Sequence, residues 1–159
     1  MSVDRHVKHR PTKEEFYDVM AATAFAQAIN GHYGADIDDN GDFGAIQAYI
    51  PHDFALLEEL VLRVIPNLAV ATMTFTVMNS YGRKDELPTT GGNLIAYSFG
   101  PTGAGVNNAT LQEIDIGLSV ANGRRSLRAK DQLGITVYRA VGQNTDFFLL
   151  GARIKYKYQ

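Results

Sequence analysis

An acidic segment around residue 40 carries the side chains best suited to bind a metal ion. Asp36, Asp38 and Asn40 alternate with other residues and are followed by Gly41; this spacing is typical of the first half of a calcium-binding loop. The twelfth position of such a loop is normally a bidentate glutamate, but here it is Gln47. Without that carboxylate calcium binding would be weak, and Asp, Asn and Gly are also the ordinary residues of a solvated turn. Calcium at Asp36, Asp38 and Asn40 is therefore a weak candidate, and the sequence indicates no other cofactor.

The histidines do not form a recognisable catalytic or metal-binding set. His6 and His9 lie in a polar N-terminal arm with no third ligand nearby, and His32 and His52 lie in predicted turns. A jelly-roll oxygenase needs histidine ligands on facing strands. The chain also has no cysteine and no G-x-S-x-G motif, and its glycine-rich segment 100–105 lacks the Lys-Ser/Thr of a phosphate-binding loop. The sequence therefore predicts a protein that is not an enzyme.

Tyrosine side chains offer another way to bind a ligand. Tyr33, Tyr81, Tyr97 and Tyr138 could stack on sugar rings, although the chain has no tryptophan, which gives the strongest stacking surface. The same tyrosines would also suit strand edges or protein interfaces. Together with the acidic segment, they make a calcium-assisted carbohydrate-binding β-sandwich module the alternative hypothesis for function.

Two basic segments could contact nucleic acid or neighbouring subunits. One is the arm at residues 5–10, and the other contains Arg124, Arg125 and Arg128. Nucleic-acid binders normally show a larger basic footprint, and the net charge of this chain is −2. We therefore interpret Arg124, Arg125 and Arg128 as candidates for salt bridges between subunits, and nucleic acid as an unlikely partner.

The N-terminal region is predicted to be an arm followed by one helix. Thr12 and Glu15 have the spacing of a capping box, and apolar residues then recur at helical intervals up to Gly31. This region, residues 1–34, is expected to be an assembly element. Its predicted contact residues are Phe16, Met20 and Phe25.

The rest of the chain, residues 35–159, alternates apolar and polar residues in short runs separated by glycine and proline. A period of two indicates strands with one buried face, and closely spaced turns without helices favour a sandwich. We therefore predict an all-β fold, an antiparallel jelly-roll-like β-sandwich of seven to eight strands. The predicted strands are 43–50, 56–65, 68–79, 93–99, 109–118, 133–141 and 146–158.

The alternation also predicts which side chains face the core. In the last strand, Phe148, Leu150, Ala152, Ile154, Tyr156 and Tyr158 should share one face, with Arg153, Lys155 and Lys157 on the other. On the third predicted strand, Thr72, Thr74 and Thr76 should face outward. The remaining predicted core residues are Ile46, Ala48, Ile50, Leu60, Leu62, Val64, Ala71, Met73, Phe75, Val77, Ile114, Ile116, Leu118, Leu133, Ile135 and Val137.

Composition is that of an ordinary soluble domain. The chain has 159 residues, 45% of them hydrophobic and 20% charged, which is enough to bury a core without metal or disulfide cross-links. No apolar run has the length of a signal h-region or a membrane span. We therefore expect synthesis in a host cytoplasm without a signal peptide, and no membrane partner.

Four stretches resemble a known family. They are residues 50–54 (IPHDF), 112–116 (QEIDI), 130–135 (KDQLGI) and 148–156 (FLLGARIKY). In order and spacing, this part of the chain resembles the single jelly-roll modules of tailed-phage and virus-like structural proteins. Residues 1–31 lie outside the resemblance, and the segment 123–130 is more basic than the family pattern.

The resemblance implies a coat, decoration or fibre-tip protein that acts by subunit contact. Its partners would then be copies of itself and a major coat protein or another particle component. Its location would be a virion or an extracellular particle. The leading hypothesis for function is accordingly a non-enzymatic structural protein that assembles into, or decorates, a virus-like particle through its N-terminal arm and helix and its sandwich surfaces.

Overall fold

The computed structural model of the chain describes residues 11–27, 31–66, 73–82, 89–90, 95–99, 110–116, 127–144 and 146–159. All regular structure in these ranges is β-strand. None of their residues belongs to a helix with the length and apolar character needed to cross a membrane. The basic arm, with His6 and His9, lies outside the described residues, as do Arg124 and Arg125 and the glycine-rich segment 100–105.

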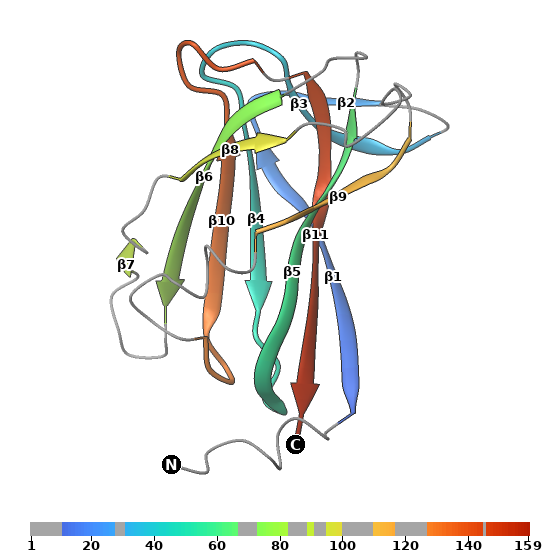
Figure 1. Cartoon of the computed structure of the whole chain (residues 1–159), viewed down its shortest axis with the longest axis vertical. Helices are drawn as coiled ribbons and strands as arrows, with labels where there is room; N and C mark the ends of the chain where they lie inside the picture. The colour runs from blue at the N-terminus through green and yellow to red at the C-terminus, as the bar shows by residue number, and fades with distance from the viewer. Residues whose placement is uncertain are drawn as a thin grey trace.

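The strands form two antiparallel layers packed face to face, so the predicted β-sandwich is confirmed (Figure 1). In the first layer, sheet A, β11 is central: β5 and β9 lie on one side of it, and β1 and β3, with β2 beyond β3, lie on the other. The strands of sheet A are β1 (Thr12–Ala22), β2 (Phe25–Gln27), β3 (Tyr33–Ile37), β5 (Phe54–Pro66), β9 (Gln112–Asp115) and β11 (Phe147–Tyr158).

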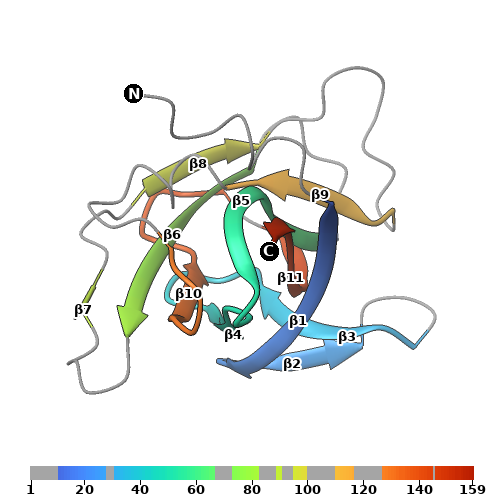
Figure 2. The same ribbon diagram turned by 90° about the horizontal axis from the view of Figure 1, so that it is seen from below.

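The second layer, sheet B, has β10 between β4 and β6, and both β7 and β8 pair with the far edge of β6. Its strands are β4 (Phe43–Tyr49), β6 (Met73–Gly82), β7 (Thr89–Thr90), β8 (Ile95–Phe99) and β10 (Gln132–Tyr138). The first part of β1 pairs with β11, and its last part pairs with β4 after a register shift between Val19 and Ala21. This one strand therefore passes from sheet A to sheet B and closes one side of the sandwich (Figure 2).

The helix predicted after Thr12 is wrong for the residues that the structure describes, because they form β1 and β2 instead. Burial along β1 alternates: Tyr17 and Val19 are partly buried, whereas Phe16 and Met20 are exposed. The strand forms because β11 and β4 each offer β1 a row of backbone hydrogen-bonding groups, and tertiary pairing of this kind overrides local propensity.

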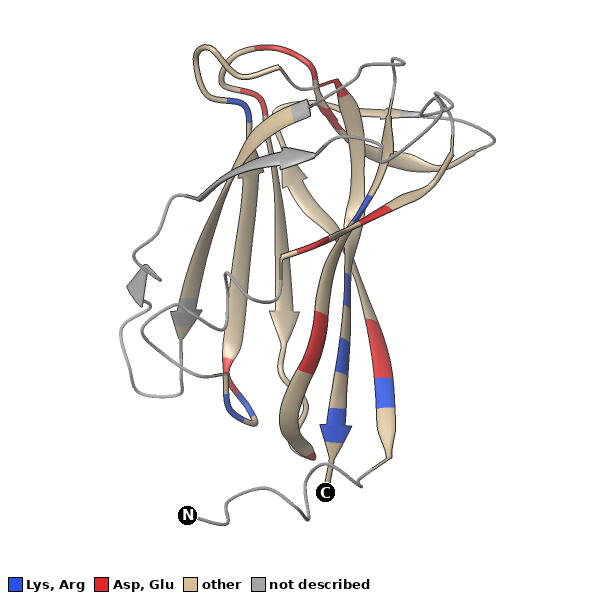
Figure 3. Cartoon of the chain, in the orientation of Figure 1, with Lys and Arg blue, Asp and Glu red and all other residues tan. Residues whose placement is uncertain are grey.

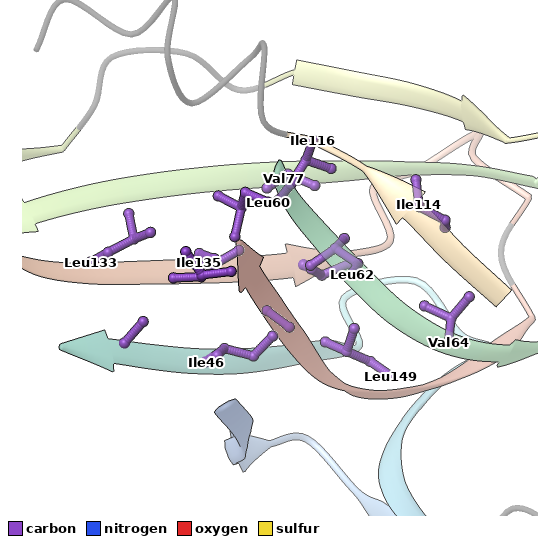
Figure 4. Packing of buried hydrophobic residues seen from close by; sticks show 14 of the residues in the cluster. Ile46, Leu60, Leu62, Val64, Val77, Ile114, Ile116, Leu133, Ile135 and Leu149 are labelled. Atoms are coloured by element: carbon purple, nitrogen blue, oxygen red, sulfur yellow. The ribbon is translucent and has the colours of Figure 1, made fainter. Parts of the chain in front are cut away.

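The core lies between the two sheets and matches the predicted alternation in most strands. Leu60, Leu62 and Val64 of β5 belong to one cluster with Leu133 and Ile135 of β10 and Leu149 of β11, and Val64 lies beside Leu149 (Figure 4); all six are fully buried. The other predicted core residues confirmed as buried are Ile46, Ala48, Ile50, Phe75, Val77, Ile114, Ile116 and Val137. Ala71 and Leu118, and the side chain of Met73, lie outside the described residues.

A β-bulge in β11 changes the face that its first residues present. The pairing of β11 with β5 shifts register between Leu149 and Gly151. Before the shift, Phe147 and Leu149 belong to the core cluster; the predicted Phe148 and Leu150 are also buried, but they alternate with these residues and so lie on the opposite face. After it, Ala152, Ile154 and Tyr156 are in the core as predicted. One extra residue reverses the alternation, because the side-chain period of a strand is two.

Thr74 and Thr76 of β6 lie on the outward face as predicted, since Phe75 and Val77 between and beside them belong to the core, and the segment before β11 contacts both threonines. Thr76 is buried, and its hydroxyl accepts a 2.7 Å hydrogen bond from the amide of Gln143. The hydroxyl of Thr74 accepts a 2.8 Å bond from the backbone N–H of Asn144. Thr72 lies outside the described residues.

Candidate functional site

The outer face of sheet B is free of charge. None of the residues of β4, β6 and β10 is Asp, Glu, Lys or Arg, and the three strands are tan throughout their described parts in Figure 3. Their register sets outward-facing residues in rows across the sheet. The rows are Tyr49–Gln132–Gly82, Gln47–Gly134–Ser80, Ala45–Thr136–Met78 and Phe43–Tyr138–Thr76.

Small residues in these rows leave a shallow trough. Ala45, Gly134 and Ser80 line a hollow of about 260 Å³, and a second hollow of about 440 Å³ lies beside Tyr17 and Tyr49. Met20, Gln47 and Gln132 line both hollows, so the two are continuous. A Cβ atom on Gly134 would collide with the hydroxyl of Ser80. The trough therefore depends on glycine at this position.

Tyr49 is the main aromatic group of the trough, and its backbone is held in place. Its side chain is 52% exposed, and its carbonyl oxygen accepts a 2.7 Å hydrogen bond from the hydroxyl of Tyr17. Burial raises the pKa of Tyr17 to about 12, so this hydroxyl stays protonated and able to donate at any physiological pH. Beside Tyr49, the amide of Gln47 donates to the amide oxygen of Gln132 at 3.5 Å. The trough thus combines one exposed ring with two amides.

The outer face of sheet A has the opposite character. Arg153 of β11 contacts carboxylates on three other strands, namely Glu14 of β1 at 3.1 Å, Glu59 of β5 at 2.9 Å and Glu113 of β9 at 2.8 Å. These bonds hold the pKa values of Glu59 and Glu113 below their usual range and raise the pKa of Arg153. Lys155 adds a 3.4 Å pair with Glu59. This face is therefore a network of mutually neutralised charges, blue and red in Figure 3.

The acidic segment forms the turn between β3 and β4, and part of it is a self-capped turn. One carboxylate oxygen of Asp42 accepts hydrogen bonds from the backbone N–H groups of Asp39, at 2.9 Å, and Asp38, at 3.4 Å. The side chain of Arg139 donates to the carbonyl oxygen of Asp38, and Gly41 has a φ of +92°, which favours glycine. The Asp42 carboxylate thus closes the turn by binding backbone N–H groups three and four residues before it.

The same turn gathers three carboxylates, one of which, Asp38, is among the predicted calcium residues. Oxygens of Asp38, Asp39 and Asp42 lie within 4.8 Å of one another and could hold a cation; the predicted Asn40 is an exposed residue of the same turn. The predicted Asp36 lies on β3, and one of its oxygens is buried without a hydrogen-bond partner, as is one oxygen of Asp146. Burial, followed by the charges of Asp146, Asp42 and Asp39, raises the pKa of Asp36.

The predicted interface residues do not form one surface. Phe16 faces outward on sheet A, where the guanidinium of Arg63 lies 5.2 Å from its ring centre. Met20 lines the trough of sheet B, and Phe25 lies on β2. Arg128 is exposed, and its backbone N–H donates to Asp131 at 2.9 Å.

Phe25 belongs to an uncovered aromatic edge of sheet A. Residues paired across strands point to the same face, and Phe25 pairs with Ala35, which is fully buried in the core. Tyr33 lies two residues before Ala35 and therefore shares this face. Phe25 is nevertheless 54% exposed and Tyr33 68% exposed, and β2 is the last strand at this end of the sheet order among the described residues. Sheet B does not cover this core-facing edge.

Sequence reasoning missed Tyr49, Gln47 and Gln132 as site residues. Of the tyrosines predicted to stack on sugars, Tyr33 is exposed at the edge of sheet A and Tyr138 is partly buried on sheet B. The side chains of Tyr81 and Tyr97 lie outside the described residues. The segments that form β4, β6 and β10 contain no charged residue, and this could have been noticed in the sequence. The sequence did not show that these three strands are neighbours in one sheet.

Comparison with known proteins gives similarity in fold only. No family model matches the chain, and no curated protein matches it. The isomalto-dextranase of Arthrobacter globiformis, solved in complex with panose, is similar to this chain with a TM-score of 0.52 and 14% identity. The match covers 90% of this chain but 23% of the dextranase, so the chain spans about a quarter of that enzyme's length.

Two further solved structures match with lower TM-scores, 0.36 and 0.29, and with 10% identity each. The family 11 carbohydrate-binding module of Clostridium thermocellum matches over 99% of this chain and 91% of its own. The Desmodium yellow mottle tymovirus matches over 94% and 88%. Neither of these two matches supports a conclusion about this chain, and the likeness to the dextranase concerns the fold alone.

Proposed function

We propose that this protein is a non-enzymatic structural subunit that assembles with copies of itself. The observation that carries the proposal is the uncovered aromatic edge formed by Phe25 and Tyr33. Two large aromatic side chains on the core-facing side of the last two strands, β2 and β3, expose apolar surface that a neighbouring subunit can bury. The outer edge of β2 has no pairing strand among the described residues, which allows contact by strand addition as well.

The particle role is the form of assembly that the sequence resemblance favours. In this proposal the chain forms or decorates a virus-like particle, and its partners are further copies of itself and a coat protein or other particle component. Phe16, Met20 and Phe25 remain proposed contact residues on different surfaces, and Arg124, Arg125 and Arg128 provide charges for salt bridges at the rim. The proposed location is a virion or an extracellular particle.

The test is the oligomeric state of the purified full chain. Size-exclusion chromatography with light scattering, over a range of concentrations, should give masses above that of one chain, and negative-stain images should show defined assemblies. Replacing both Phe25 and Tyr33 with serine should shift the mass toward the monomer, because the apolar surface that drives contact is lost. Val141→Ser, at a residue 87% exposed on a distant turn, is the matched control. A wild-type chain that is monomeric at every concentration would refute the proposal.

A second candidate is a calcium-assisted carbohydrate-binding module, favoured by the cluster of Asp38, Asp39 and Asp42. A ligand that binds only the folded state raises the melting temperature. Millimolar calcium should therefore stabilise the wild-type chain, and the double change Asp38→Asn with Asp39→Asn should remove the effect. Asp18→Asn, on exposed β1, is the control. An unchanged melting temperature in calcium would exclude the ion.

A further inference from the structure

We propose that the trough on the outer face of sheet B binds an uncharged glycan chain. The class of ligand, a carbohydrate, comes from the second candidate function, so the proposal rests on that function for the choice of ligand. It adds where the glycan lies and which residues hold it, and it needs neither calcium nor assembly. The residues proposed to contact the glycan are Tyr49, Gln47, Gln132, Thr136 and Ser80.

The first argument is the charge of the two faces. A fifth of the residues in the chain are charged, yet β4, β6 and β10 contain none, and no charged residue is among the described residues that line the trough. A site for nucleic acid or an acidic polymer would need cations to attract it. An uncharged face complements an uncharged ligand, because no charge on either side has to be desolvated.

The second argument is the kind of polar group in the trough. Sugar hydroxyls both donate and accept hydrogen bonds, and so do the amides of Gln47 and Gln132 and the hydroxyls of Thr136 and Ser80. A ring of Tyr49 that is half exposed offers its face to the apolar side of a sugar. The Tyr17 hydrogen bond fixes the backbone of Tyr49, so less freedom is lost when the ligand binds.

The third argument is shape. Tyr49 and Ala45 both line the trough and lie four residues apart on β4, so the trough extends roughly 13 Å along this strand, with Gly134 of β10 beside its middle. This length suits an oligosaccharide better than a single sugar. Gly134 has no side chain, so a ligand can approach the sheet closely at the middle of the trough.

A protein partner fits this face less well. The backbones of β4, β10 and β6 are already paired with one another, so they offer no free edge to a peptide strand. Of the residues lining the trough, only Met20 and Tyr49 are large, apolar or aromatic and strongly exposed. A stable dimer interface normally buries a larger apolar centre. The face is therefore better suited to a hydrated polar chain.

The test is binding of the full chain to soluble neutral polysaccharides in EDTA. Affinity electrophoresis against dextran, a mixed-linkage β-glucan and a galactomannan should show retardation by at least one of them, and calorimetry with its oligosaccharides should show affinity rising with length until the trough is filled. Tyr49→Ala should weaken binding at least about tenfold. The double change Gln47→Ala with Gln132→Ala should do the same. Leu111→Ala, 49% exposed and outside the trough, should bind as the wild type does, and thermal melts check that each variant folds.

The outcomes separate this proposal from the function on which it rests. If Tyr49→Ala keeps glycan binding and the double change Asp38→Asn with Asp39→Asn abolishes it, the trough is not the glycan site. The glycan-binding function itself would then still be supported. Retention only on an acidic polysaccharide such as polygalacturonate would also overturn it. No retention on any of the three neutral polysaccharides, with or without calcium, would overturn both. If the Tyr49 variant and the double glutamine variant lose glycan binding while Leu111→Ala keeps it, the result supports the trough as the glycan-binding site.

Discussion

Replacing Arg153 with methionine tests whether its ionic network stabilises sheet A. The Arg153 side chain is 11% exposed and contacts Glu14, Glu59 and Glu113 at 2.8–3.1 Å. Methionine keeps the apolar stem of the side chain and removes the charge. The change therefore separates the ionic contacts of this residue from its packing.

The size of the effect follows from the exposure of the partners. Hydrogen bonds to buried charges are worth about 1.5–3 kcal/mol each, but exposed ion pairs are worth about 0–1 kcal/mol. Here the cation is mostly buried and the three carboxylates are partly exposed. Each contact should therefore stabilise the fold by somewhat less than about 1 kcal/mol, near the upper end of the range for exposed ion pairs. The glutamates left behind can be rehydrated. We therefore expect Arg153→Met to lower the free energy of unfolding by about 2 kcal/mol, or the melting temperature by about 4–8 °C.

The pH dependence gives a second and sharper readout. Because Arg153 lowers the pKa values of Glu59 and Glu113 from 4.5, the stability that these carboxylates contribute is fully present above pH 4.5. It is lost as the pH falls through their lower folded-state pKa values. Urea unfolding between pH 7 and pH 2 should therefore show a shallower acid loss of stability in Arg153→Met than in the wild type.

Lys155→Met is the matched control, because Lys155 lies on the same face of β11 and has a single 3.4 Å contact, with Glu59, among its described ion pairs. It should cost less than about 1 kcal/mol. If Arg153→Met unfolds with the same free energy and the same acid profile as the wild type, the reasoning that this network is stabilising is wrong.

Two other substitutions test features of the fold. Asp36→Asn should raise the free energy of unfolding at pH 7 by less than about 1 kcal/mol, seen as a higher urea midpoint. Burial raises the folded-state pKa of Asp36 above its ordinary value of 3.8, so the stability linked to its protonation is present below pH 3.8 and is lost as the pH rises through the higher folded-state pKa. A wild type and a variant with identical stability from pH 3 to pH 7 would contradict this. Gly151→Ala should cost about 2–3 kcal/mol, because the added Cβ would overlap the carbonyl oxygen of Tyr17 and push β1 away from β11. Gly41→Ala, which has open space but a φ of +92°, should cost only about 1 kcal/mol, and equal losses from the two changes would count against the close contact.

Local alternation predicted the strands well where each strand has one buried face throughout. The predicted 43–50 and 133–141 match β4 and β10 to within a few residues, and their inward residues are buried. It failed in β11, where the bulge at Gly151 reverses the faces. A bulge depends on where the partner strands place their hydrogen bonds, which is not local information.

The N-terminal segment shows the limit of reading one element alone. A capping box and the helical spacing of Val19, Ala22, Ala26 and Ile29 were the basis for a helix prediction, but these features do not exclude a strand over a short stretch. The outcome depended on β11 and β4, which lie far along the sequence and leave adjacent edges for β1. For the same reason, the sequence did not indicate that the turn would bring Asp39 and Asp42 close to Asp38; calcium binding at the predicted residues stays a prediction.

By itself, the sequence determined that the chain is built from strands, which residues of most strands lie in the core, and that three segments carry no charge. These properties follow from the two-residue period of an extended backbone and from composition, and both are local. Three other features could be seen only in the folded chain. The three uncharged strands are neighbours, and Gly134 pairs between the levels of Tyr49 and Phe43 on β4. Phe25 and Tyr33 lie on strands that extend beyond the covering sheet. Strand order and register result from competition between distant segments for the same backbone hydrogen bonds and the same core volume, and no single segment contains that information.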